Sequence, residues 1–231
     1  MDILAKGFRQ ALWMLVSGDP EVWAILWLSL QVSGIATLLS LLIGVPIGAG
    51  LALSRFPARR LIVGAVNTGM GLPPVVVGLF VTILLWRSGP FGRLEILYTP
   101  LAIILAQAVI AAPIVTGITL AAVQNVPQPF RLQLLGLGAS RAQMVWIVLR
   151  EARLPMLAAV MAGFGGVISE IGASLMVGGN IRGHTRTLTT AMVLETGKGN
   201  FEVAIALAVL LLVLMFLVNW VLTSIQQRGE R

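Results

Sequence analysis

Residues 22–54 read VWAILWLSLQVSGIATLLSLLIGVPIGAGLALS and contain no charged residue. A helix needs about 20 predominantly apolar residues to cross the hydrocarbon layer of a bilayer. At 1.5 Å per residue this stretch would form a helix about 50 Å long, so it must tilt or project beyond the bilayer. Pro46 marks a predicted kink within it. The sequence therefore predicts a membrane-spanning helix here.

The residues before this stretch predict how the helix begins. Asp19-Pro20-Glu21 combines a capping Asp, a proline suited to the first turn and an acid near the positive end of the helix dipole. Residues 1–17 are too short and too charged to span, and no signal-peptide cleavage site follows them. We expect them to form an amphipathic helix lying in the membrane interface. Its apolar face would consist of Leu4, Phe8, Leu12, Leu15 and Val16, with Lys6, Arg9 and Gln10 elsewhere.

Four further apolar stretches follow along the chain. They cover residues 61–86, 100–124, 155–178 and 201–225, and a polar tail occupies 226–231. The first is interrupted by Gly69-Met70-Gly71-Leu72-Pro73-Pro74, and the second contains Pro113. We expect residues 178–200, rich in glycine and threonine, to form a loop. The sequence predicts an all-α, polytopic bundle of about five transmembrane helices in a single domain, 1–231.

Basic residues suggest an orientation for this bundle. Five crossings place the two termini on opposite sides. The turn at 55–60, the polar segment 125–154 and the tail then share one side, with nine of the sixteen Lys and Arg residues. The excess of positive charge in cytoplasmic loops favours that side as the cytoplasm by a small margin.

Composition excludes several classes of protein. Hydrophobic residues make up 58% of the chain and charged residues 11%, whereas a soluble domain carries about a quarter of charged residues. The net charge of +7 is spread over short segments between apolar runs, so we expect no nucleic-acid binding. There is no cysteine and one histidine, His184, so no metal site is expected. The sequence contains neither a glycine-rich phosphate loop nor a carboxylate pair that would indicate an enzyme.

The stretch 155–178 carries a buried acid, Glu170. Small residues recur every four positions with it and would form one ridge along an unbroken helix: Ala158, Ala162, Gly166, Glu170 and Ser174. An acid inside a membrane helix is costly and is often functional. Glu170 is therefore either part of a transport pathway or a structural glutamate bonded to a neighbouring helix.

Two other segments could serve transport. The break at Pro73-Pro74 could line a pathway, because broken helices survive in a bilayer only beside protein or water; the alternative is a kink that only shapes packing. Residues 178–187 offer glycine amides, arginines and hydroxyls. These groups suit either a tetrahedral oxyanion or docking of an acidic partner.

Several motifs resemble the ABC importer permeases. Leu135–Arg141 (LGLGASR), running on to Leu154-Pro155, resembles their cytoplasmic motif, although Leu132-Gln133-Leu134 stands where Glu-Ala-Ala is usual. Ile168–Ala173 (ISEIGA) resembles the molybdate and tungstate branch. Met176–Ala191 (MVGGNIRGHTRTLTTA) and Gly71–Gly78 (GLPPVVVG) look like the tungstate transporter permeases.

This resemblance implies a MetI-like architecture and a set of partners. A second copy of the chain would complete the pore in the bilayer of a bacterial inner membrane. Cytoplasmic ABC ATPase subunits would bind ATP and Mg²⁺, this chain would bind no cofactor, and a substrate-binding protein would deliver the anion.

The resemblance also implies roles for residues. ATPase coupling would fall to Gly136, Gly138, Ala139, Ser140 and Arg141, within a coupling segment at 125–154. The gate would be formed by Pro73, Pro74, Ser169, Glu170 and Gly172. The loop facing the binding protein would present Asn180, Arg182, His184 and Arg186.

The expected function is therefore the permease of an ATP-driven tungstate importer. Molybdate or sulfate are alternative cargoes of the same machine, and an ATP-independent carrier or channel is the alternative from another class. Because Glu170 would repel a dianion, we expect it to hold the gate without contacting substrate.

Overall fold

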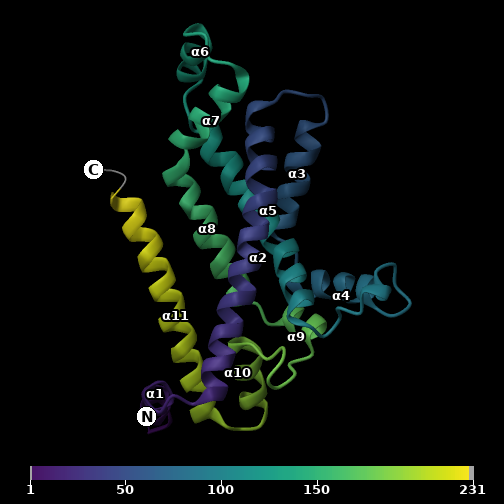
Figure 1. Cartoon of the computed structure of the whole chain (residues 1–231), viewed down its shortest axis with the longest axis vertical. Coiled ribbons are helices and arrows are strands. Elements are labelled where there is room, and N and C mark those ends of the chain that lie inside the picture. The colour runs from purple at the N-terminus through teal and green to yellow at the C-terminus, as the bar shows by residue number, and fades with distance from the viewer. Residues whose placement is uncertain (1, 229–231) are drawn as a thin grey trace.

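The computed structural model describes residues 2–228, without the side chains of Asp2, Leu15 and Arg228. All regular elements in this range are helical, which confirms the all-α prediction. They are α1 (Asp2–Val16), α2 (Pro20–Leu53), α3 (Arg59–Met70), α4 (Pro74–Leu85), the 3-10 turn η1 (Gly92–Leu94), α5 (Pro100–Gln124), α6 (Gln128–Gly136), α7 (Arg141–Glu151), α8 (Arg153–Ile168), α9 (Gly172–Gly178), α10 (Leu188–Gly197) and α11 (Phe201–Arg228) (Figure 1).

The long helix α2 begins as its sequence predicts. The side chain of Asp19 accepts a hydrogen bond from the backbone N–H of Glu21 at 2.9 Å, and Pro20 occupies the first turn. The helix continues through Pro46 to Leu53. It forms the longest element of the bundle.

The centre of the bundle is the close contact between α2 and α5. A Cβ atom at Gly48 would lie 2.6 Å from the carbonyl oxygen of Thr116, and one at Gly44 would lie 2.8 Å from Val115 Cγ1. The hydroxyl of Ser40 donates to the Ala108 carbonyl at 3.1 Å. Small residues at four-residue spacing let helix backbones approach in this way. Gly44-x-x-x-Gly48 is the sequence signal for this contact.

The described helices provide three to five membrane spans. Helices α2, α5 and α11 are each long and apolar enough to cross a bilayer. Two bent pairs, α3 with α4 and α8 with α9, would bring the number to the predicted five if each pair counts as one span. The bends are 100° and 60° respectively. In Figure 1, α4 consequently points away from the long axis of the bundle.

The first helix, α1, packs beneath α11 through its small residues. Ala11 and Met14 are buried, and Gly7 closely approaches Ile205. The opposite face exposes apolar side chains, namely Leu4, Phe8 and Leu12. The side chain of Leu15 lies outside the described residues. An outward apolar face suits the interfacial position, which stays a prediction.

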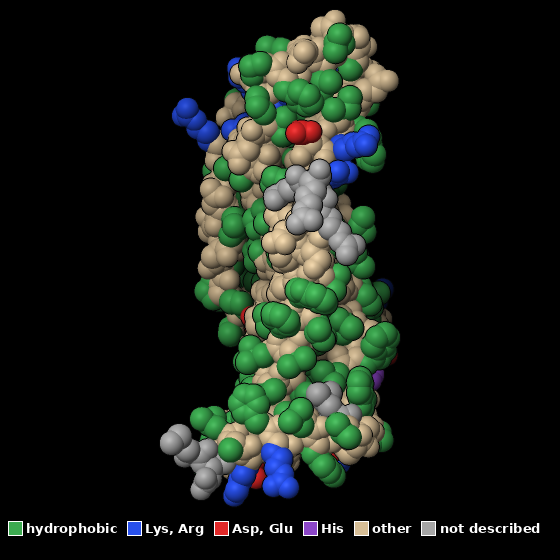
Figure 2. Space-filling model, turned by 90° about the vertical axis from the view of Figure 1, so that its left-hand side faces the viewer, with side chains coloured by type: hydrophobic (Ala, Val, Ile, Leu, Met, Phe, Trp, Pro, Cys, Tyr) green, Lys and Arg blue, Asp and Glu red, His purple; other side chains and the backbone are tan. Residues whose placement is uncertain are grey.

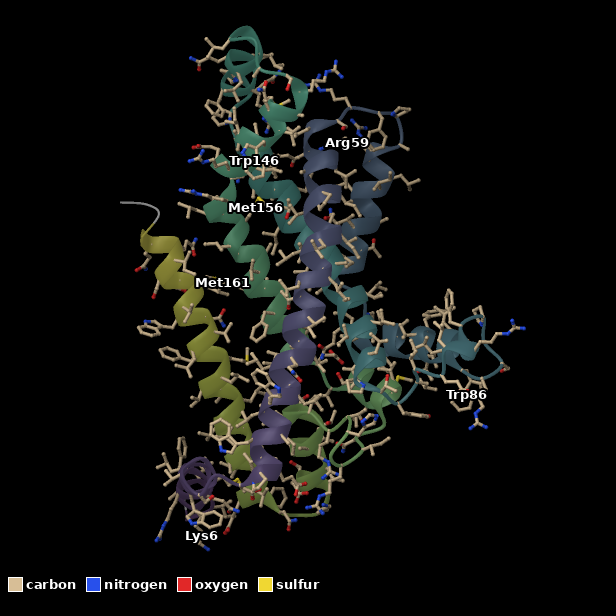
Figure 3. The ribbon with its side chains drawn as sticks, viewed as in Figure 1. Lys6, Arg59, Trp86, Trp146, Met156 and Met161 are labelled. Carbon is tan, nitrogen blue, oxygen red and sulfur yellow. The ribbon has the colours of Figure 1, made fainter. Side chains whose placement is uncertain are left out.

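The two ends of the molecule carry most of its charged groups; Arg87, Arg93 and Glu95 lie beyond α4 instead. The α6–α7 segment and the turn between α2 and α3 lie at one end, and α1 and α10 lie at the other (Figure 1). Arg59 and Trp146 mark the first end and Lys6 the second in Figure 3. Figure 2 shows basic side chains mainly towards these ends, with a largely hydrophobic surface between them. This arrangement agrees with the grouping of the 55–60 turn and the 125–154 segment on one side.

The prediction of a loop over residues 178–200 is wrong for its second half, because α10 occupies Leu188–Gly197. The side chains of Thr187 and Thr190 form a reciprocal capping box at its start. Leu188 and Ala191 are buried in the core. Capping and burial therefore outweigh the low helix propensity of threonine. Helix α11 continues into the polar tail as far as Arg228; residues 229–231 lie outside the described range.

Candidate translocation site

The two bent helix pairs meet at the contact between α4 and α9. A Cβ atom at Gly78 would lie 2.6 Å from the Cα atom of Ala173, and one at Gly172 would lie 2.5 Å from Val75 Cγ2. Only glycine permits such close packing of backbone on backbone. This contact brings the Pro73-Pro74 break together with the segment that contains Ser169, Glu170 and Gly172.

The α3–α4 break is produced by its own sequence. Pro73 adopts an extended conformation, with φ −61° and ψ 122°, and Pro74 begins α4. Neither proline can donate a backbone hydrogen bond, so α3 cannot continue through them. The end of α3 is held against α5, where Gly69 lies close to Pro113 and Gly117 lies close to Met70.

The α8–α9 break corrects the predicted ridge. Helix α8 ends at Ile168, so Glu170 lies between two helices and does not continue a row along one helix. Ala158, Ala162 and Gly166 are exposed in this chain. The buried side of α8 instead carries Ala159, Gly163 and Val167. A four-residue repeat describes one face only while the helix is unbroken.

Glu170 has a defined structural part in this break. Its Oε1 accepts a hydrogen bond from the backbone N–H of Ala173 at 3.0 Å, which caps the first turn of α9. Its backbone carbonyl accepts from Thr189 Oγ1 at 3.1 Å. The exposed Ser169 donates its hydroxyl to the Gly165 carbonyl at 2.8 Å. Glu170 therefore fixes the local geometry, and its part in gating stays a prediction.

The sequence analysis missed Gln107 of α5, which is 2% exposed. Its Nε2 donates to the Val167 carbonyl at 3.0 Å and to Ser174 Oγ at 3.3 Å, so it bonds both helices flanking the break. Within residues 2–228 its Oε1 has no hydrogen-bond partner. An amide side chain in the middle of the apolar stretch 100–124 was a signal that could have been used.

The loop 179–187 is tied to the start of α2 by ion pairs. Arg182 contacts Glu21 through both Nε, at 2.8 Å, and NH2, and Arg186 NH1 lies 3.5 Å from Glu21 Oε1. The hydrogen bond from Arg182 to Glu21 raises the pKa of Arg182 above its ordinary value. Arg186 also donates to Asn180 Oδ1 at 3.3 Å. The arginines that could have bound an oxyanion are therefore already paired.

A cleft of about 510 Å³ lies between this loop and the first turns of α2. Pro20, Trp27 and His184 are among its lining residues. The cleft lies at the end of the molecule opposite to α6 and α7, so Asn180, Arg182, His184 and Arg186 form a group separate from the α4–α9 contact.

At the other end, α6 and α7 form an exposed helical tip, defined here as residues 128–151. Gly138 joins the two helices with φ +87°, a conformation that favours glycine. Ser140 and Gln143 form a capping box that starts α7. Leu137 is 79% exposed and Trp146 is 69% exposed. A cleft of about 450 Å³ runs along the tip, lined by Leu134, Leu137, Gly138, Ala139, Gln143, Trp146 and Ile147.

Among the residues that the structure describes, no three His, Asp or Glu side chains lie close enough to hold a metal ion. Some buried polar groups join helices, as those of Ser40 and Gln107 do, and others, such as the hydroxyls of Thr37 and Thr116, bond only their own helix. The described arrangement thus offers two joined helix breaks inside an apolar bundle, with exposed segments at both ends.

An apolar bundle with two broken helix pairs in contact is the architecture expected of a membrane permease. Residues 44–231 match the family model "Binding-protein-dependent transport system inner membrane component". The chain belongs to this family and is therefore a multi-pass inner-membrane protein.

Individual relatives agree with this assignment. The tungstate uptake system permease protein TupB of Peptoclostridium acidaminophilum is 38% identical over 98% of this chain and 100% of its own length. A probable anion ABC transporter permease protein of Haloferax volcanii is 43% identical over 83% of this chain and 84% of its own. The molybdenum transport permease ModB of Escherichia coli (strain K12) is 29% identical over 94% of this chain and 100% of its own. A solved chain of the MetNI methionine ABC transporter, in an inward-facing conformation, superposes with a TM-score of 0.77. It is 20% identical and covers 92% of this chain and 99% of its own, which confirms the MetI-like fold.

Proposed function

We propose that this chain is the permease subunit of an ATP-driven tungstate importer. The observation that carries the proposal is the full-length similarity to TupB, a tungstate uptake permease, at 38% identity. The ModB similarity is equally extensive but weaker, at 29% identity. Molybdate is therefore the second candidate cargo, and sulfate the third.

In this proposal two copies of the chain form the pore, and each binds a cytoplasmic ABC ATPase subunit. ATP and Mg²⁺ bind to the ATPase, so the permease alone is not catalytic. A substrate-binding protein delivers the anion at the opposite face. The family description, a binding-protein-dependent transport component, supports this arrangement over an ATP-independent carrier or channel.

The helical tip is the proposed docking site of the ATPase. Exposed apolar side chains such as Leu137 and Trp146 are costly in water unless a partner covers them. Arg131, Arg141 and Arg150 lie within the same tip, which favours the aqueous side of the membrane for it. The ATPase subunit should therefore bind the wild-type chain and fail to bind a variant that lacks residues 132–140.

The α4–α9 contact is the proposed gate, formed by Pro73, Pro74, Ser169, Glu170 and Gly172. Non-helical backbone at membrane depth is found where protein or a water-filled path surrounds it. Glu170 repels a dianion and is bonded to the α9 backbone, so in this proposal it holds the gate and does not bind substrate. The 179–187 loop, at the far end from the tip, faces the binding protein.

The test is uptake into vesicles that contain this chain, a cytoplasmic ATPase and a binding protein. We expect ATP-dependent uptake that prefers tungstate over molybdate and sulfate. ATP-driven uptake of another anion would retain the machine and change the cargo. Uptake that is independent of ATP, or present without the ATPase, would refute the proposal.

A further inference from the structure

Helix α5 is bonded at its cytoplasmic end to the helical tip. Arg131 of α6 donates through NH2 to the carbonyl oxygens of Val123, a close contact, and of Val126, at 3.0 Å. These carbonyls belong to the last turn of α5 and to the residues after it; that of Val123 also accepts the backbone N–H of Val126 at 3.3 Å. Arg131 is partly buried, and it joins two helices that follow each other in the chain.

The same helix is bonded near its other end to the α8–α9 break. The amide of Gln107 holds the Val167 carbonyl in the last turn of α8 and Ser174 in the first turn of α9. A neutral amide buried in a low-dielectric interior is expensive unless its polar atoms are paired. Oε1 of Gln107 has no hydrogen-bond partner among the described residues. Burying this side chain therefore costs free energy that apolar packing alone does not explain.

The segment of α5 between these two points is a continuous helix. It is helical throughout from Pro100 to Gln124, including Pro113. Gln107 and Val123 are separated by about 24 Å along the axis at 1.5 Å per residue. Packing of Gly44 and Gly48 against α5 leaves little room for bending.

We infer that α5 transmits movement of the helical tip to the α8–α9 break, with Arg131 and Gln107 as the positioning residues at its two ends. The inference rests on the proposed function for the identity of the two sites, the ATPase-binding tip and the gate. Energetic coupling between distant sites is carried by packed side chains, hydrogen bonds and rigid elements, and α5 supplies all three in one line. Neither residue contacts the transported anion in this scheme.

The structure provides a matched control for each residue. Arg59 also bonds the C-terminal carbonyls of a long helix, through Nε to the Leu51 oxygen of α2 at 2.7 Å, but it does not belong to the tip. Thr116 is a buried polar residue of α5, 3% exposed, whose hydroxyl bonds only its own helix, at the Ala112 carbonyl. Arg59→Met and Thr116→Val should therefore leave transmission intact.

The first experiment tests transmission in the purified full-length chain in lipid vesicles. The chain contains no cysteine, so Ser169→Cys gives one spin-label site in the break, at an exposed position. We expect Arg131→Met to change the label's mobility as Gln107→Met does, while Arg59→Met and Thr116→Val leave it unchanged. Arg131→Lys, which keeps the positive charge and one donor nitrogen, should fall between wild type and Arg131→Met. An unchanged spectrum in Arg131→Met, or an equal change in Arg59→Met, overturns the inference.

The second experiment measures anion uptake per ATP hydrolysed in the assembled transporter. We expect Arg131→Met and Gln107→Met to lower this ratio by about five-fold or more, the lower end of typical coupling between linked sites. ATPase binding should be retained. Because both residues act on one route, the double variant should be no worse than the worse single variant. Multiplied losses would contradict a single route. Wild-type uptake tests the proposed function separately from these comparisons.

Discussion

The α3–α4 and α8–α9 breaks are produced in different ways. The α3–α4 break bends by 100° at two adjacent prolines, and no side chain caps α4. The α8–α9 break bends by 60° and contains no proline between Ile168 and Gly172. It is held by hydrogen bonds from elsewhere in the chain, made by Gln107 and Thr189, together with the cap from Glu170.

This difference indicates which break can change during a transport cycle. The α3–α4 break is favoured by its own sequence, because two adjacent prolines donate no backbone hydrogen bonds. A break held by a few hydrogen bonds can exchange partners when a neighbouring helix moves, and each exchange involves only about 1 kcal/mol. We therefore regard the α3–α4 break as the fixed half of the site and the α8–α9 break as the movable half.

The largest effect is expected where the two breaks touch. Gly78→Val would place side-chain atoms against the backbone of Ala173 and should lower the free energy of unfolding by about 3 kcal/mol, because backbone cannot yield as a flexible side chain does. Thermal unfolding in detergent measures the loss. Gly64→Val is the control, since no atom lies within 4 Å of a Cβ at that position. An equal midpoint for both variants would show that the contact is not close.

Removing the prolines tests whether the first break is truly local. In the Pro73→Ala, Pro74→Ala double variant, restored amide donors allow α3 to continue, so the 100° bend should open. Spin labels at Leu61→Cys and Ser88→Cys should move apart by more than about 5 Å, because α3 and α4 are each about 18 Å long at 1.5 Å per residue and opening the bend separates their far ends. Pro90→Ala, in the exposed turn after α4, should leave the distance unchanged. A bend that survives the double variant would mean that tertiary contacts hold it.

Glu170 allows the capping and the charge of the second break to be separated. Glu170→Gln keeps an oxygen acceptor for the Ala173 amide, whereas Glu170→Ala removes it and should cost about 1 kcal/mol of stability, as loss of a helix cap does. We expect the Gln variant to assemble normally but to alter the ratio of uptake to ATP hydrolysis. Unchanged uptake and unchanged ATPase stimulation in Glu170→Gln would exclude a part for the charge in gating.

The smallest effect is expected on the stability of the turn from α10 to α11, where Glu195 bonds Lys198 and Asn200. Hydrogen bonds from Asn200 and Lys198 lower the pKa of Glu195 below its ordinary value of 4.5. Because the folded-state pKa is the lower one, its contribution to stability is fully present above about pH 4.5 and is lost as the pH falls through the lowered value. Amide exchange protection of residues 198–200, referenced to an unfolded peptide at each pH, should fall in that range.

Glu195→Gln should remove this pH response. The α3–α4 break contains no ionisable residue between Gly69 and Pro74 and serves as an internal reference. A parallel loss of protection in both regions would indicate general acid unfolding.

The features predicted from sequence are those set by neighbouring residues. Long apolar stretches predicted α2, α5 and α11, and Asp19-Pro20 predicted the start of α2. Pro73-Pro74 predicted the first break, and resemblance of Leu135–Arg141 to a permease motif predicted the helical tip. Each signal acts within a few residues of the structure that it determines.

The features that were missed depend on contacts between distant residues. Residues 155–178 read as one apolar helix because its break is stabilised from α5 by Gln107 and from the start of α10 by Thr189. Helix α10 was missed because burial against α11 and α2 compensates for its threonines. The fold class and the α3–α4 break could thus be predicted from sequence, whereas the geometry of the α8–α9 break could not.

The unequal lengths of the helices also bear on how the chain enters the membrane during synthesis. Each of α2, α5 and α11 is long enough for a translocon to release into lipid alone, whereas the seven residues of α9 are too few. Folding of membrane proteins in two stages, insertion followed by helix association, then places α2, α5 and α11 in the bilayer before α9 can be seated. We therefore expect α2, α5 and α11 to insert first. Helix α9 would pack last, once the amide of Gln107 in α5 is in place to bond it.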